Sequence, residues 1–177
     1  MAGSTQIIVL CTERPEALFS LGSYVDSTPR LAGLSWGAED LSAAVGAMAK
    51  RGESGEWLPP YAMARSLCLF AAAAAEVAAI DTVFTDFRDA DGLAGFAANA
   101  RRDGFSGMLA IHPDQVDVIN RAFVPTAAEL ERAERIVALF EANAGAGTLG
   151  MDGEMIDRPH LVQAQRILQL ARRLAAL

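Results

Sequence analysis

A repeated alternation of short apolar runs and helical segments constrains the fold of this chain more than any other feature. Four runs of apolar or β-branched residues occupy positions 7–11, 31–36, 82–85 and 107–111. Each run is followed by a segment whose periodicity or composition favours a helix. Strands that alternate with helices at this spacing predict a parallel sheet covered by crossover helices. The sequence therefore predicts an α/β fold.

Glycine and proline residues mark where the predicted helices begin and end. Pro15 stands in the first turn of the first helix, and Gly22 and Gly104 follow the ends of the first and the fourth. The third helix contains a run of five alanines, the residue with the highest helix propensity. The expected helices cover residues from about 15 to 21, 40–49, 61–78, 92–102 and 114–123.

A different pattern begins after residue 123. Thr126 and Glu129 have the spacing of a capping box, which predicts a helix start. The helix that follows carries an apolar stripe, formed by Leu130, Ala133, Val137 and Phe140. We expect this stripe to be buried against a partner surface, because an apolar helix face is not stable in water.

The remainder of the chain predicts a Gly/Ala loop, a turn at residues 152–153 and a last helix at residues 159–174. Pro159 suits the first turn of this helix. Asp157 stands two residues before the proline, where an N-cap is expected.

Composition and charge exclude several classes of protein. The formal net charge is −7, so we do not expect a surface that neutralises nucleic-acid phosphates. The longest apolar run, residues 67–75, is far shorter than the roughly 18 residues of a membrane span, and the N-terminus lacks the basic region of a secretory signal. We therefore expect a cytoplasmic protein that binds neither nucleic acid nor membranes. Cys11 and Cys68 lie in apolar surroundings and are expected to be buried free thiols.

Candidate functional residues follow the ends of the predicted strands, which form the ligand-binding edge of parallel α/β folds. Glu13 and Asp40 come just after two consecutive strands, and two carboxylates with open positions between them suit Mg²⁺. The alternative is structural, because Asp40 is an ordinary N-cap for the next helix and Glu13 stands beside a helix start. His112 follows the fourth strand and is either a base near a ligand or a hydrogen-bonded turn residue.

Several segments resemble, in order and along nearly the whole chain, the C-terminal part of the citrate lyase beta-subunit group. This group belongs to the HpcH/HpaI aldolase superfamily and includes malyl-CoA and citramalyl-CoA lyases. The segments that carry the resemblance are TER, LAGLSWGAEDLSAAVGA, GFSGMLAIHPDQVDVIN, FVPTAAELERA and DGEMIDRPH.

The resemblance implies a TIM (β/α)8 barrel with Mg²⁺ bound between Glu13 and Asp40. It implies that the backbone at Gly37 and Ala38 helps to hold the carboxylate of the substrate. Asp157 would be the catalytic acid or base, carried on a lid that reaches a neighbouring subunit of a homo-oligomer. The implied reaction is Claisen-type cleavage or condensation of a carbon–carbon bond in the CoA thioester of a hydroxy acid, such as malyl-, citramalyl- or citryl-CoA.

Only four of the eight βα units of such a barrel are found here, and the first of them matches the fifth unit of the family. The expected fold is therefore the C-terminal half of a barrel, residues 1–123, followed by a helical lid, residues 124–177. The substrate-binding arginine of the family lies in the other half. Another copy or chain completes the barrel, or the sequence is part of a longer protein. A CoA-thioester hydrolase on the same site and a non-catalytic remnant that serves only assembly remain as alternative functions.

Overall fold

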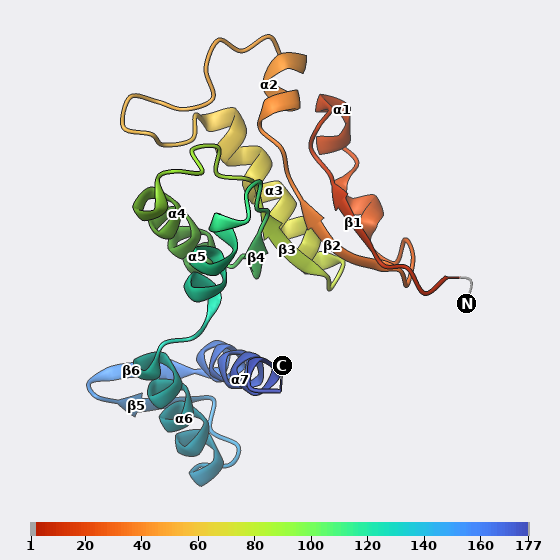
Figure 1. The fold of residues 1–177 in the computed structure, drawn as a ribbon. Helices are drawn as coiled ribbons and strands as arrows, with labels where there is room; N and C mark the ends of the chain where they lie inside the picture. Colours follow the sequence, from red (N-terminus) through yellow and green to blue (C-terminus); the bar gives the residue numbers. More distant parts are fainter. Residues whose placement is uncertain (1–2, 177) are drawn as a thin grey trace. The chain divides into compact units, whose positions relative to one another are not determined.

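The computed structural model describes residues 3–176, and in this range the first unit of the chain contains a four-stranded sheet (Figure 1). All of its neighbouring strands are parallel, and their spatial order follows the sequence. The strands are β1 (Ile7–Leu10), β2 (Leu31–Ser35), β3 (Ala78–Asp81) and β4 (Gly107–Met108). The predicted α/β class is confirmed.

Helices connect these strands and cover one face of the sheet. The connecting elements are α1 (Pro15–Leu18), the 3₁₀ turn η1 (Leu21–Tyr24), α2 (Glu39–Ala44), α3 (Pro59–Ala74), α4 (Ala90–Asp103) and, after β4, α5 (Asp114–Phe123). Within the described residues, no helix is long and apolar enough to cross a membrane.

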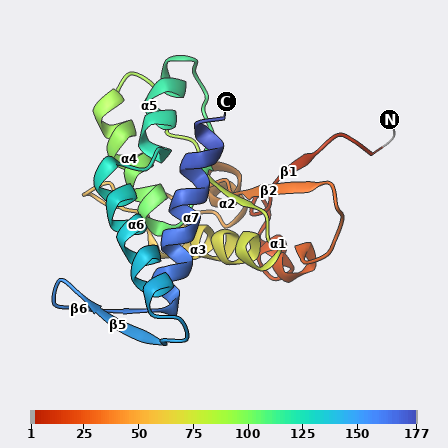
Figure 2. The ribbon, with the colours of Figure 1, turned by 90° about the horizontal axis from the view of Figure 1, so that it is seen from below.

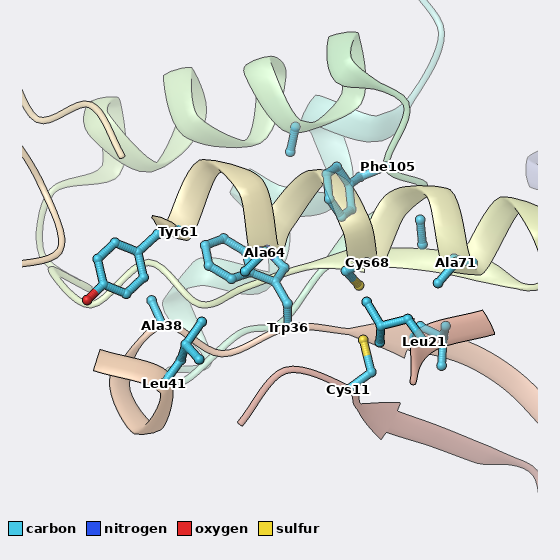
Figure 3. Packing of buried hydrophobic residues seen from close by; sticks show 14 residues of the cluster. Cys11, Leu21, Trp36, Ala38, Leu41, Tyr61, Ala64, Cys68, Ala71 and Phe105 are labelled. Atoms are coloured by element: carbon cyan, nitrogen blue, oxygen red, sulfur yellow. The ribbon is translucent and has the colours of Figure 1, made fainter. Parts of the chain in front are cut away.

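The core lies between the sheet and α3 (Figure 3). α3 turns small buried residues, among them Ala64 and Ala72, toward the strands, so the helix packs closely on the sheet. Cys11 and Cys68 are free thiols with exposures of 1% and 0%, as predicted, and their sulfur atoms face each other in this core. Trp36, at the end of β2, is also fully buried.

The third strand lies four residues before its predicted position. α3 stops at Ala74 because Glu76 adopts a φ of +55° and the Val77 amide donates to the carbonyl of Ala72. The chain then pairs with β2 at once, in the parallel ladder of β3. Alanine disfavours strands, so local propensity hid this strand, and pairing with the neighbouring strand overrides that propensity. Residues 82–85 therefore form the loop after the strand.

Two predicted helices are shorter than expected. α1 ends at Leu18, and Gly22 lies inside the following 3₁₀ turn instead of beyond a helix end. α2 ends at Ala44. By contrast, Gly104 closes α4 with a φ of +112°, as its position predicted.

Residues 124–177 form a second compact unit. It consists of α6 (Ala127–Ala142), a hairpin of β5 (Thr148–Met151) and β6 (Glu154–Asp157), and α7 (Arg158–Leu174). The predicted capping box is present at the start of α6. The hairpin was not predicted, although Asp152 and Gly153 at its turn have φ values of +54° and +82°, which an Asp-Gly hairpin turn requires.

The apolar face of α6 is covered inside this second unit, where α7 lies alongside α6 (Figure 2). Ala133, Ile136 and Phe140 are buried against Ile156 of the hairpin and Ala164 of α7. The expectation that the stripe needs an outside partner is therefore wrong, because α7 and the hairpin supply that partner. The stripe carries no argument for a subunit interface.

Candidate active site

Four of the predicted site residues line one cavity of about 390 Å³ at the carboxyl edge of the sheet. Glu13 follows β1, whereas Gly37, Ala38 and Asp40 lie where β2 leads into α2 (Figure 1). Thr82 and Thr85, in the loop after β3, contribute to the same cavity. The structure thus brings together Glu13, Gly37, Ala38 and Asp40, whereas His112, the other candidate in the first unit, is not among the residues that line this cavity.

Thr12 joins the ends of β1 and β2, a role that the sequence did not reveal. Its buried hydroxyl oxygen accepts a hydrogen bond from the Gly37 amide at 3.1 Å and lies 3.3 Å from the Gly37 carbonyl, to which the hydroxyl donates. A Cβ at Gly37 would lie 3.9 Å from Oε1 of Glu13, so the two strand ends are close neighbours. The backbone amides of Gly37 and Ala38 were both candidates to bind a ligand. Because the Gly37 amide already donates to Thr12, the Ala38 amide is the one that remains for a ligand.

Glu13 and Asp40 are both exposed, and neither carboxylate has a hydrogen-bond or ion-pair partner among residues 3–176. Glu39, which lines the same cavity, differs because it forms an ion pair with Lys50. The alternative role of Asp40 as an N-cap is wrong: Ala38 occupies the N-cap position of α2, and no side chain caps this helix. Two free carboxylates at one cavity are available to a cation.

The number of carboxylates fits a particular kind of metal. Within the described part of the chain, no group of three or more His, Cys, Asp or Glu residues could hold a metal ion. A closed site for zinc needs more protein ligands than this edge offers. Mg²⁺ is bound through one or two carboxylates and takes the rest of its ligands from water and substrate, so Glu13 and Asp40 fit it.

A network of hydrogen bonds and ion pairs, centred on a buried carboxylate, holds Trp36, one of the residues that line the cavity, in place. Asp81, at the end of β3, is 0% exposed and accepts a hydrogen bond of 2.6 Å from Nε1 of Trp36, which lines the cavity. Arg65 of α3 donates to Asp81 at 2.7 and 3.0 Å and to Asp103 of α4 at 2.7 Å. This network ties the ends of β2 and β3 to two helices, and it was not predicted because the third strand was expected to begin after Asp81.

Asp157 belongs to the second unit and occupies the N-cap position of α7. Nδ1 of His160 lies 2.5 Å from Oδ1 of Asp157. This hydrogen bond with His160 lowers the pKa of Asp157, so the carboxyl group is ionised at neutral pH. His112, by contrast, is a turn residue: its Nδ1 accepts from the Asp114 amide at 3.2 Å, and its ring stacks on Phe87.

The fold defines a class of protein: α/β proteins with a parallel sheet, in which ligands bind at the carboxyl ends of the strands. The model of the HpcH/HpaI aldolase/citrate lyase family matches residues 2–113, which is more than half of the chain. The chain belongs to this family.

Relatives and solved structures agree with this assignment. The citrate lyase subunit beta of Leuconostoc mesenteroides subsp. cremoris is 38% identical over 110 residues, which cover 61% of this chain and 36% of that protein. A (3S)-malyl-CoA thioesterase of Cereibacter sphaeroides is 34% identical over 154 residues, 84% of this chain and 51% of that protein. The crystal structure of CitE from Mycobacterium tuberculosis in complex with magnesium, acetoacetate and coenzyme A matches with a TM-score of 0.77 at 27% identity, over 96% of this chain and 69% of that one. The chain thus spans about a third to a half of the length of these curated relatives.

Proposed function

We propose that this chain carries the Mg²⁺ site and part of the substrate site of a lyase that acts on CoA thioesters of hydroxy acids. The observation that carries the proposal is the pair of unpaired carboxylates, Glu13 and Asp40, on one cavity at the carboxyl edge of the sheet. The complex of CitE with magnesium, acetoacetate and coenzyme A supports the same metal and the same class of ligand.

Each residue of the first unit has a distinct role in this proposal. Mg²⁺ held by Glu13 and Asp40 would supply positive charge to the oxygen atoms at the acyl end of the substrate. The Ala38 amide would donate to the substrate carboxylate, and Gly37 would leave room for it because it has no side chain. Thr12 would keep these groups in place through its hydrogen bonds with Gly37.

Asp157 is the proposed acid/base residue. In the cleavage direction, the hydroxyl group of the acyl chain loses its proton, the neighbouring carbon–carbon bond breaks, and the thioester enolate that is released takes up a proton. Asp157 can accept this proton because its carboxyl group is ionised at neutral pH, although the hydrogen bond with His160, which lowers its pKa, also makes it a weaker base. It would reach the reacting atoms from the second unit of another copy in a homo-oligomer.

The four strands of the first unit are, in this proposal, half of an eight-stranded TIM barrel. β1 forms an edge of the sheet, and its side chains Ile8 and Leu10 are 52% and 43% exposed. An apolar edge strand is normally covered, because its free backbone groups and its side chains favour association. Further strands, from another segment or another chain, would pair with this edge.

A thioester hydrolase is the second candidate function. The similarity to a (3S)-malyl-CoA thioesterase, which covers 84% of this chain, favours it. Hydrolysis would use the same cation and the same thioester but transfer the acyl group to water, so the carbon–carbon bond would stay intact.

An assay of the purified chain with malyl-, citramalyl- and citryl-CoA in the presence of Mg²⁺ tests the proposal and separates the candidates. A lyase cleaves each of these esters to acetyl-CoA and the matching oxo acid. A hydrolase releases free CoA and the intact hydroxy acid. No turnover of any of these esters, together with no binding of Mg²⁺, would favour the non-catalytic remnant.

A further inference from the structure

A small hairpin places Arg51 beside the candidate active site. The Leu58 amide donates to the Lys50 carbonyl at 2.9 Å, and the Gly52 amide donates to the Glu56 carbonyl at 2.9 Å. Between these two hydrogen bonds, Arg51 and Trp57 form an antiparallel bridge. Directly opposed residues of an antiparallel pair have their side chains on the same face, so these two side chains meet.

Aromatic rings fix the position of the Arg51 guanidinium group. Its central carbon lies 3.6 Å from the centroid of the Trp57 ring and 5.3 Å from that of Phe96. Trp57 packs edge-to-face on Trp36, with ring centroids 4.9 Å apart. Trp36 is in turn bonded to buried Asp81. A series of packed side chains therefore connects the guanidinium group to the sheet. Because the Arg51 side chain is already held in place, a ligand that binds it costs little side-chain conformational entropy.

Arg51 differs from the neighbouring cations because no carboxylate pairs with it among residues 3–176. Its one hydrogen bond within that range runs from a terminal nitrogen to the Gly55 carbonyl at 2.7 Å. Lys50 is paired with Glu39, and Arg65 is paired with two aspartates. Partial burial lowers the pKa of Arg51, yet an arginine remains charged at neutral pH. A half-buried cation of this kind has most of its five N–H donors available to an anion.

Two cavities meet at Arg51. One is the cavity of about 390 Å³ that contains Glu13 and Asp40, and the other, of about 510 Å³, lies between the hairpin and α4. Arg51 and Trp57 line both. The cavity at the carboxyl edge of the sheet thus contains two carboxylates, Glu13 and Asp40, and a guanidinium group, Arg51, that are unpaired among residues 3–176. The carboxylates are available to a cation and the guanidinium group to an anion, because neither carboxylate forms an ion pair with Arg51.

We propose that Arg51 is a ligand-binding residue that recognises an oxyanion, either a carboxylate or a phosphate, of the substrate. The planar guanidinium group matches the two oxygens of such a group with parallel hydrogen bonds. The identity of the ligand rests on the proposed function, because malyl-, citramalyl- and citryl-CoA each carry a free carboxylate as well as the phosphates of CoA. The anion site itself rests only on the geometry of Arg51.

The test measures anion binding by the purified chain in metal-free buffer at low ionic strength, where charge interactions are least screened. Malonate and inorganic phosphate are the two probes, and sodium chloride of equal ionic strength is the control. Tryptophan fluorescence is the signal, because both tryptophans of the chain, Trp36 and Trp57, line the cavity. The variants are Arg51→Ala, Arg51→Lys and, as a matched control, Lys50→Ala. Near-ultraviolet circular dichroism checks that the hairpin keeps its aromatic packing.

We expect saturable binding to the wild-type chain, a loss on the order of tenfold or more in Arg51→Ala and partial recovery in Arg51→Lys. Lys50→Ala should bind within about twofold of wild type, since Glu39 already neutralises Lys50. Tighter binding of malonate would indicate the acyl carboxylate as the natural group, and tighter binding of phosphate would indicate the phosphates of CoA. Equal binding by wild type and Arg51→Ala, or no saturable signal beyond the chloride control, would overturn the inference. Because the buffer contains no metal, this experiment does not test the Mg²⁺ site, and the two proposals can fail independently of each other.

Discussion

Removal of the Asp81 side chain should destabilise the first unit more than any other single truncation at this edge of the sheet. The carboxylate is 0% exposed and accepts hydrogen bonds from Trp36 at 2.6 Å and from Arg65 at 2.7 and 3.0 Å. Asp81→Ala leaves the indole N–H without this acceptor and leaves the guanidinium group with Asp103 alone. Loss of one partner from a buried ion pair costs about 3–5 kcal/mol. We therefore expect the free energy of unfolding to fall by about 3–5 kcal/mol.

Urea unfolding followed by tryptophan fluorescence measures this change, because Trp36 and Trp57 both lie in the first unit. Asp103→Ala is the matched control, because Asp103 is the other partner of Arg65. The side chain of Asp103 is 40% exposed. An exposed ion pair contributes about 1 kcal/mol or less, so this variant should stay close to wild type. A loss of less than about 1 kcal/mol in Asp81→Ala, or equal losses in both variants, would refute the reasoning.

Three further predictions concern the second unit. Thr126→Ala should lower the stability of this unit by about 1 kcal/mol, because it removes the capping box of α6. Thr126→Ser keeps the hydroxyl group and should stay close to wild type. Equal unfolding curves for Thr126→Ala and wild type, measured by circular dichroism, would contradict the capping role. Since His160 lowers the pKa of Asp157, the ionised carboxylate stabilises the fold above about pH 4 and this contribution is lost as the pH falls further. An NMR titration should show the pKa of Asp157 returning to its ordinary range in His160→Ala, and an unchanged pKa would argue against the contact. If the chain, alone or with the rest of the barrel supplied, acts on a CoA ester as proposed, Asp157→Asn should reduce that turnover on the order of 10²-fold with little change in stability. Normal turnover would make Asp157 only a helix cap.

Elements with strong local signals could be predicted from the sequence. The Gly104 helix end and the Thr126 capping box depend on residues within one turn of each other, and both are present in the structure. β3 could not be predicted, because its alanines favour a helix and only pairing with β2 makes them a strand. The partner of the apolar stripe on α6 was missed because Ile156 of the hairpin and Ala164 of α7, which cover it, come later in the chain, and no local pattern predicts such contacts.

The candidate site was predictable in part. Glu13 and Asp40 could be named because residues after parallel strands gather at one edge of a sheet. Their surroundings could not be predicted, since Thr12 bonds to a residue 25 positions away and Trp36 to one 45 positions away. Such pairs carry no local pattern. The unpaired state of Arg51 depends in the same way on where all nearby carboxylates lie.

Binding of Mg²⁺ to the purified chain, measured by isothermal titration calorimetry, tests the central claim most directly. Glu13→Gln and Asp40→Asn each remove one unpaired carboxylate from the cavity, whereas Glu39→Gln removes the carboxylate that Lys50 already neutralises in the same cavity. We predict that wild type and Glu39→Gln bind Mg²⁺ with similar affinity and that Glu13→Gln and Asp40→Asn each bind it more weakly, on the order of tenfold or more. Equal affinities in all four proteins, or the largest loss in Glu39→Gln, would contradict the assignment of Glu13 and Asp40 as the metal ligands.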